Sequence, residues 1–126
     1  VFLTAPLTDQ TRKMFDASTL SAMKPGAVLI NVARGGLVVE QAVVDALESG
    51  HLDSAGFDVT PEEPPAANSP LWTAPGLIIT PHVGGQSGKR IDRMTDLFCE
   101  NIIRYRSGRP LINSVDKKLG FPPPVS

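Results

Sequence analysis

The chain has 126 residues, a length that suits one ordinary domain and is too short for two well-cored ones. Apolar residues make up 41% of it and charged residues 20%, which is typical of a soluble globular protein rather than a disordered or fibrous one. With 12 Lys and Arg residues against 13 Asp and Glu residues, the net charge of -1 argues against a basic surface for nucleic acid or for a membrane.

The cysteine count and the first residues bear on the compartment and on the completeness of the chain. Cys99 is the only cysteine and cannot form a disulfide within the chain, so we expect a reducing, cytoplasmic compartment. No metal-ligand spacing surrounds Cys99, and no apolar run reaches the roughly 20 residues that a transmembrane helix needs. We expect no signal peptide, and because the chain opens on Val1 within an apolar run, we expect it to be a fragment of a longer protein.

Predicted strands and helices alternate along the first half of the chain. A short strand at residues 1–5 ends before a proline, and residues 8–23 are polar at first and then compatible with a helix. Residues 27–31 (AVLIN) are a continuous apolar run, as expected of a parallel strand that is covered on both faces. After a turn at residues 34–36 (RGG), a helix is predicted from about residue 40 to 49.

The second half of the chain continues this alternation. Strands are predicted at residues 54–59 and 77–80 (LIIT), and a proline-rich connection separates them. From residue 87 to 107, apolar residues recur at steps of three and four and predict a long amphipathic helix. The final FPPP run, residues 121–124, cannot continue regular structure and is expected on a surface. The apolar face of the long helix consists of Ile91, Met94, Phe98, Ile102 and Tyr105.

This order of elements predicts an α/β fold with a parallel sheet. In such sheets, ligand sites form outside the carboxyl ends of the strands, which brings together residues that lie far apart in the chain. Arg34 and His82 each follow a predicted strand, and Asp58 lies near the end of another. Glu63 comes next in the loop at that same edge. We therefore expect four polar side chains to converge there.

These four side chains suit a reaction that interconverts a carbonyl and an alcohol. The planar guanidinium of Arg34 can hold a substrate carboxylate with two hydrogen bonds. His82 can exchange a proton with the substrate oxygen, because imidazole titrates near neutral pH. Glu63 beside it would orient the ring and favour imidazolium, the form that reduction of a carbonyl needs. The Asp58 carboxylate can accept a hydrogen bond from an amide.

Each of these residues also has a purely structural interpretation. Arg34 before two glycines is typical of an exposed turn, and two consecutive glutamates before two prolines are typical of a solvated acidic loop. His82 can equally be a histidine that only stabilises the fold through its hydrogen bonds. His51, after the predicted helix, is expected at the surface, and Cys99 on the long helix is expected to pack.

Several segments form one ordered set along the chain. They are PLT (6–8) with Thr11, KPGAVLINVARGG (24–36), DV (58–59), EEP (62–64) and TPHVG (80–84). In this order and at these separations, they resemble the D-isomer-specific 2-hydroxyacid dehydrogenase family. The resemblance covers residues 1–107, and the ordered set is far more specific than any one of its members.

The resemblance implies a role for each matching residue. Arg34 is similar to the family's substrate-binding arginine, Glu63 to the carboxylate paired with the catalytic histidine, and His82 to that acid/base. Asp58 is similar to the residue that hydrogen-bonds the nicotinamide carboxamide. The other cofactor contacts that the resemblance implies are Thr4, Ala5, Pro6, Val32, Ala33, Arg34, His82, Gly84 and Gly85.

The implied fold is the C-terminal half of a doubly wound, Rossmann-like NAD(P)-binding domain. Residues 1–85 would form the second half of that domain, and residues 86–126 would form a helix and tail that belong to the substrate domain. The implied reaction is hydride transfer between NAD or NADP and C2 of a small 2-oxo or 2-hydroxy acid. The full-length protein would be a homodimer with no nucleic-acid partner, no membrane partner and no metal.

Two features depart from the family's pattern. The phosphate-binding GxGxxG loop and the residue that separates NAD from NADP would lie upstream of Val1, because GGQSG at residues 84–88 has the wrong spacing. Glycines at that position can still let a ligand approach closely. Val39 stands where the family usually has an acidic residue at the start of a helix, so Glu40 would cap the first turn or that turn would fray.

Within the family, Thr60 and the SPLW segment at residues 69–72 are most similar to glyoxylate/hydroxypyruvate reductases, since phosphoglycerate dehydrogenases more often have Phe in place of Thr60. Three alternatives stay open: a phosphoglycerate dehydrogenase-like enzyme, an NAD(H)-sensing corepressor-like binding protein, and an inert, partly folded fragment. A partner-binding cleft or a nuclear signal upstream would favour the second. Half a doubly wound sheet, with its apolar edge and uncovered faces, fits the third.

Overall fold

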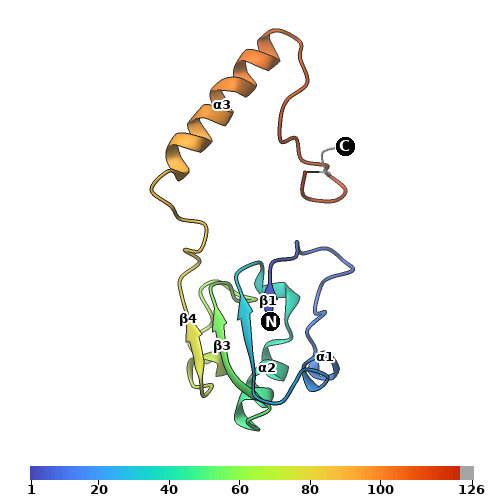
Figure 1. Ribbon diagram of the computed structural model, residues 1–126, viewed down its shortest axis with the longest axis vertical. Helices are drawn as coiled ribbons and strands as arrows, with labels where there is room; N and C mark the ends of the chain where they lie inside the picture. The colour runs from blue at the N-terminus through green and yellow to red at the C-terminus, as the bar shows by residue number, and fades with distance from the viewer. Residues whose placement is uncertain (123–126) are drawn as a thin grey trace. The chain divides into compact units, whose positions relative to one another are not determined.

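The computed structural model describes residues 1–122 and divides the chain into two compact units, Val1–Gly84 and a second that begins at Gly85. The first unit is built on four parallel strands in the order β1-β2-β3-β4 (Figure 1). This confirms the predicted α/β fold with a parallel sheet. The strands are β1 (Phe2–Leu3), β2 (Ala27–Asn31), β3 (Leu52–Phe57) and β4 (Leu77–Ile79).

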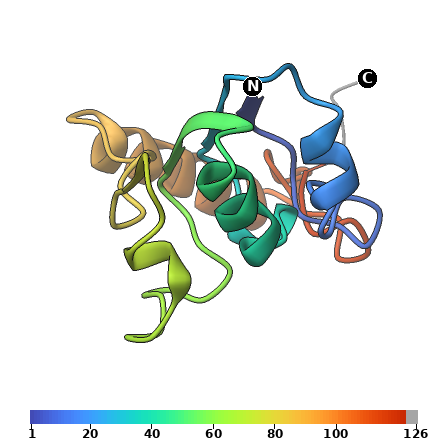
Figure 2. The ribbon, with the colours of Figure 1, turned by 90° about the horizontal axis from the view of Figure 1, so that it is seen from below.

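Helical segments connect the strands of the first unit. Figure 2 shows α2 against one face of the sheet, with α1 beside it. A short 3-10 helix, η1, leads into α2, and a second, η2, packs on α2 from the connection between β3 and β4. These elements are α1 (Ala17–Ser21), η1 (Gly35–Leu37), α2 (Glu40–Glu48) and η2 (Pro70–Trp72).

The hydrophobic core lies between α2 and the face of the sheet that α2 covers. Successive strand residues point to opposite faces, and Leu29 and Phe57 belong to the set that points inward. Val43 and Leu47 enter the same core from the apolar stripe of α2. Because full burial of such side chains is worth roughly 1.5–3 kcal/mol each, this contact is what holds the unit together.

The other face of the sheet is open within the first unit. Phe2, Val28 and Ile78 lie on it and are 73%, 41% and 71% exposed. The apolar run of β2 predicts a strand that is covered on both faces, whereas this unit covers it on one. Three large apolar side chains are therefore available for burial by another surface.

Two segments differ in extent from the sequence prediction. β3 begins at Leu52, two residues before the predicted start, because Leu52 pairs with Ala27 ahead of a bulge, and it ends earlier, at Phe57. Residues 8–23 are helical only in α1, because Thr8 and Thr11 hydrogen-bond each other's backbone N–H groups and hold a turn instead.

Two side chains near helix ends are placed differently from the sequence prediction. His51 is half-buried rather than on the surface, and its Nε2 lies 3.0 Å from the Leu20 carbonyl oxygen, which links the start of β3 to α1. No side chain caps the first turn of α2, which nevertheless begins at Glu40. The Glu40 carboxylate instead accepts a hydrogen bond from the Ser69 hydroxyl, and this joins α2 to the segment before η2.

The second unit contains the long helix α3 (Arg90–Arg106), which begins three residues later than predicted. Its predicted apolar face is exposed within this unit, from 43% for Ile102 to 79% for Tyr105. Asn101 exchanges two hydrogen bonds with the backbone of Ile112 and fastens the following segment to α3. Of the FPPP run, residues 123 and 124 lie outside the described residues. Across residues 1–122, no helix is long and apolar enough to cross a membrane.

Candidate active site

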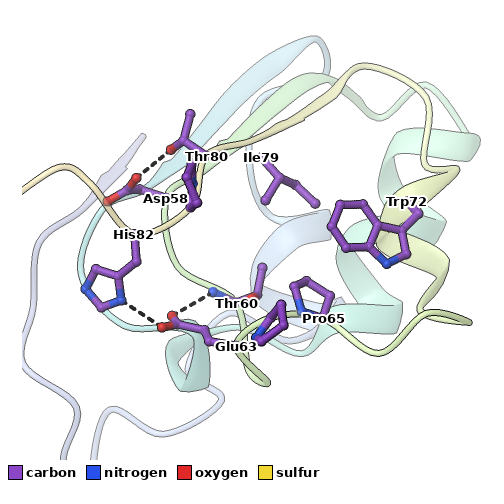
Figure 3. Close-up of a pocket in the computed structure, with 10 residues that line it drawn as sticks. Asp58, Thr60, Glu63, Pro65, Trp72, Ile79, Thr80 and His82 are labelled. Atoms are coloured by element: carbon purple, nitrogen blue, oxygen red, sulfur yellow. Dashed lines mark hydrogen bonds and ion pairs between the residues drawn. The ribbon is translucent and has the colours of Figure 1, made fainter.

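The carboxyl edge of the sheet collects the polar residues that the sequence singles out. Arg34 follows β2, and Asp58 follows β3 directly. Glu63 lies in the loop after β3, and His82 comes three residues after the end of β4. Figure 3 shows Asp58, Glu63 and His82 with the side chains that surround them.

His82 and Glu63 form a hydrogen-bonded ion pair. His82 Nδ1 lies 2.7 Å from Glu63 Oε2, and the two side chains are 48% and 41% exposed (Figure 3). The hydrogen bond to His82 is the main reason that the pKa of Glu63 lies below its ordinary value. The positive charge of Arg34 makes the smallest contribution to lowering this pKa, and the Arg34 Nη1 itself donates to the Ala33 carbonyl oxygen at 2.6 Å. The pair, with both side chains partly exposed, is therefore open to solvent.

The loop that carries Glu63 is shaped by Thr60. The Thr60 N–H donates to Glu63 Oε1 at 3.2 Å, and the Thr60 hydroxyl donates to the Glu62 carbonyl oxygen at 2.7 Å. Thr60 is buried, whereas Glu62 and Glu63 are exposed, so both contacts are partly buried. The Glu63 carboxylate thus has one oxygen on the loop backbone and the other on His82, which fixes its direction.

Asp58 is 8% exposed, and its carboxylate accepts hydrogen bonds from the turn that follows β4. Its Oδ1 accepts hydrogen bonds from the Thr80 hydroxyl at 2.5 Å and from the Val83 N–H at 2.9 Å. Its Oδ2 accepts one from the Gly84 N–H at 2.6 Å. These hydrogen bonds lower the pKa of Asp58, and the bond from the Thr80 hydroxyl has the largest effect. A Cβ at Gly84 would stand 2.8 Å from Oδ2, so the close approach requires glycine.

The turn that carries Arg34 is fixed by a buried side chain. Asn31 at the end of β2 is fully buried, and its amide accepts the Ala33 N–H at 3.1 Å and donates to the Arg34 carbonyl oxygen at 3.0 Å. Gly35 packs so closely on the next loop that a Cβ there would stand 2.0 Å from the Thr60 carbonyl carbon. The Arg34 turn is thereby held against the loop of Glu63.

Sequence reasoning assigned no role in shaping this edge to four residues that do shape it. A polar residue that ends the apolar run AVLIN is a pattern that could have identified Asn31. The others have no such pattern, because their roles depend on contacts between loops. The four residues are Asn31, Gly35, Thr60 and Thr80.

The residues expected to contact a dinucleotide lie after three of the strands. Thr4, Ala5 and Pro6 follow β1, Val32 and Ala33 follow β2, and Gly84 follows β4. Gly85 begins the second unit. The donor and acceptor groups suit a nicotinamide carboxamide, because Asp58 Oδ2 accepts a single hydrogen bond from residues 1–122 and has a second lone pair to offer.

A cavity of about 350 Å³ lies behind the histidine–glutamate pair (Figure 3). Asp58, Glu63 and His82 line its polar side, and Trp72 and Ile79 line its apolar side. The Trp72 indole N–H donates to the Ala66 carbonyl oxygen at 2.9 Å, which holds the ring in place. In the part of the chain that the structure describes, no group of three or more His, Cys, Asp or Glu side chains is placed to hold a metal ion.

The fold and the site together define an α/β protein with a paired histidine and carboxylate at the carboxyl edge of a parallel sheet. Residues 1–84 match the family model described as D-isomer specific 2-hydroxyacid dehydrogenase, NAD binding domain. The chain therefore belongs to the D-isomer specific 2-hydroxyacid dehydrogenase family.

Individual relatives agree with this assignment. The chain is 42% identical over 112 residues to a glycerate dehydrogenase of Methylorubrum extorquens, covering 87% of this chain and 36% of that protein. It is 35% identical over 119 residues to a glyoxylate/hydroxypyruvate reductase B of Serratia proteamaculans, covering 94% and 35%. A family member from Xanthobacter autotrophicus, solved with NADPH and MES, superposes with a TM-score of 0.83 at 40% identity, covering 92% and 47%. The chain thus spans less than half the length of each.

Proposed function

We propose that this chain is the C-terminal part of an NAD(P)-dependent D-2-hydroxyacid dehydrogenase. The full-length enzyme would transfer a hydride between the nicotinamide ring and C2 of a small 2-oxo or 2-hydroxy acid, such as glyoxylate or hydroxypyruvate. The observation that carries the proposal is the 2.7 Å pair of His82 and Glu63 at the strand edge that also bears Arg34. The match of residues 1–84 to an NAD-binding domain supports it.

The side chains divide the chemistry among them. The nicotinamide supplies or accepts the hydride when it is bound. His82 uses Nδ1 for Glu63, which leaves Nε2 to give a proton to the substrate carbonyl oxygen during reduction and to take it back during oxidation. The lowered pKa of Glu63 means that it keeps its negative charge at lower pH than an ordinary glutamate, so it can orient the His82 ring through Nδ1. Arg34 binds the substrate carboxylate through its planar fork.

The cofactor contacts proposed are those that the family resemblance implies. They lie after β1, β2, β3 and β4, and the relative from Xanthobacter autotrophicus, solved with NADPH, supports a dinucleotide along this edge. They comprise Thr4, Ala5, Pro6, Val32, Ala33, Arg34, Asp58, His82, Gly84 and Gly85.

We also propose the organisation of the full-length enzyme. Residues 1–85 would complete the dinucleotide-binding domain, and residues 86–126 would belong to the substrate domain. We expect a cytoplasmic homodimer, in line with the lone Cys99 and with the family resemblance. Light scattering on the purified full-length enzyme tests the oligomeric state.

Substitutions in the full-length enzyme test the catalytic roles. His82→Ala should lower kcat by about 100-fold or more, because general acid–base catalysis contributes typically that much. Arg34→Ala should mainly raise KM for the 2-oxo acid, since it removes a carboxylate contact. His51→Ala is the matched control, because His51 lies just before β3, at the other end of that strand from Asp58, and its Nε2 contacts only the Leu20 carbonyl oxygen among the hydrogen bonds of the described residues. Near-normal turnover of His82→Ala would refute the acid/base assignment.

The choice of substrate is a separate test. Glycerate is the reduced form of hydroxypyruvate, so the glycerate dehydrogenase and hydroxypyruvate reductase relatives favour the same pair of substrates. We expect hydroxypyruvate and glyoxylate to give higher kcat/KM than pyruvate. Oxidation of NAD(P)H, followed by absorbance with each acid in turn, measures this preference.

A further inference from the structure

The turn that carries His82 is held by contacts that are separate from its pair with Glu63. On the near side, the Thr80 hydroxyl donates to Asp58 Oδ1. On the far side, the N–H groups of Val83 and Gly84 donate to the same carboxylate at 2.9 and 2.6 Å. His82 therefore lies between residues that are fastened to one buried side chain, both before it and after it.

The backbone of His82 needs this support. Its φ is 54°, in the left-handed region that residues other than glycine adopt uncommonly and that persists only where the surroundings enforce it. The His82 N–H also donates to the Thr80 carbonyl oxygen at 3.0 Å. If the flanking contacts loosened, the backbone could relax to a commoner conformation and the imidazole would leave the Glu63 carboxylate.

Thr80 is well placed to be the fixed point of this turn. Its N–H donates to the Phe57 carbonyl oxygen at 2.9 Å, so its backbone continues the pairing of β4 with β3. Its hydroxyl reaches across to Asp58, which directly follows β3. Thr80 thus attaches the turn to two neighbouring strands of the sheet, β3 and β4, which are more rigid than a loop.

We propose that Thr80 is a positioning residue for His82: its hydroxyl, through Asp58, holds the turn so that the imidazole stays paired with Glu63. The role of Thr80 in catalysis rests on the proposed function, in which His82 is the acid/base. In this proposal the Asp58 carboxylate anchors the His82 turn, in addition to any contact that it makes with the nicotinamide.

The kinetic test uses Thr80→Val and Thr80→Ser in the full-length enzyme. Valine keeps the branched shape of threonine without the hydroxyl, and serine keeps the hydroxyl. We expect Thr80→Val to lower kcat by about tenfold or more with little change in KM, because misplacing an acid/base weakens the transition state more than the bound substrate. Thr80→Ser should retain most of the turnover. Thr73→Val makes the same change at an exposed threonine and should match the wild type.

A second measurement does not depend on turnover. NMR of the His82 ring nitrogens reports the Nδ1 hydrogen bond to Glu63, and amide hydrogen exchange reports the N–H groups of Val83 and Gly84. In Thr80→Val we expect the signature of the Nδ1 hydrogen bond to be lost and both amides to exchange faster. In Thr80→Ser both should stay as in the wild type. If the full-length enzyme reduced no 2-oxo acid, the proposed function would fail, while these signals would still decide whether Thr80 positions the ring.

Several outcomes would overturn the proposal. One is a Thr80→Val enzyme with wild-type kcat, and another is an unchanged His82 signature in that variant. Equal losses in the valine and serine variants would also contradict it, since the hydroxyl would then not be the group that matters. Should Thr80→Val not fold, Gly84→Ala disturbs the same anchor, because its Cβ would stand 2.8 Å from Asp58 Oδ2. The same loss of the ring signature is expected there.

Discussion

The Asp58 carboxylate should make the stability of the folded chain depend on pH. Its pKa in the folded chain is lowered, first by the Thr80 hydroxyl and then by the Val83 and Gly84 N–H groups. A carboxyl whose pKa is depressed by folding adds stability above its unfolded value, and that contribution is lost as the pH falls through the folded value. The anchor of the His82 turn should therefore weaken in acid.

Replacing Asp58 by asparagine should remove this pH dependence. We expect Asp58→Asn to be less stable than the wild type at pH 7 and to lose less stability on acidification, because no carboxylate remains to be protonated. Urea denaturation of both proteins at several pH values measures the difference. Asp9→Asn, at an exposed position in the loop after β1, serves as the control. Parallel pH curves for Asp58→Asn and the wild type would contradict the assignment.

Gly35 sets how closely two loops of the site can approach. A Cβ at this position would stand 2.0 Å from the Thr60 carbonyl carbon and 2.3 Å from the Pro61 nitrogen, both of which are backbone atoms. Gly35→Ala should thus cost at least the roughly 1–3 kcal/mol typical of overpacking and should move Arg34 away from Glu63. Denaturation midpoints measure the cost. Gly88→Ala, where nothing lies within 4 Å of the added carbon, should be nearly neutral.

At the scale of elements, helix and strand positions follow from local patterns better than their ends do. The run AVLIN is β2 without change of bounds, and α2 begins at the residue predicted. The start of α1 is harder to predict, because the Thr8 and Thr11 side chains bind the backbone of the segment before it and keep that segment out of a helix. The end of β3 is likewise decided by its neighbours rather than by its own composition.

The short α1 should depend strongly on Asp16, the residue that precedes it. The Asp16 side chain caps the helix by accepting the Thr19 N–H at 2.9 Å, and α1 contributes the buried Leu20 to the core. Asp16→Ala should lower the free energy of unfolding, because alanine cannot accept the hydrogen bond from the Thr19 N–H. Asp16→Asn should cost less, since asparagine caps equally well. An alanine variant as stable as the wild type would show that packing of Leu20 alone holds α1.

For the whole molecule, we predict that the isolated chain of 126 residues binds NAD(H) weakly or not at all and has no measurable turnover. The sequence contains no GxGxxG loop for the dinucleotide phosphates, and the first unit leaves one face of its sheet open at Phe2 and Ile78. Calorimetric titration with NADH and an absorbance assay with hydroxypyruvate test this. Robust reduction by the isolated chain would overturn it.

The amino-acid sequence by itself determined the α/β class, the strand edge at which polar residues gather and the family to which the chain belongs. These follow from periodicities and ordered motifs that are properties of the chain alone. The sequence also predicted that His82 and Glu63 pair, but only the tertiary structure decided which atoms meet, that Asp58 holds the His82 turn, and that Thr60 and Gly35 bring two loops together. The reason is physical: such contacts join residues far apart in sequence through loops, whose conformations have no period to detect.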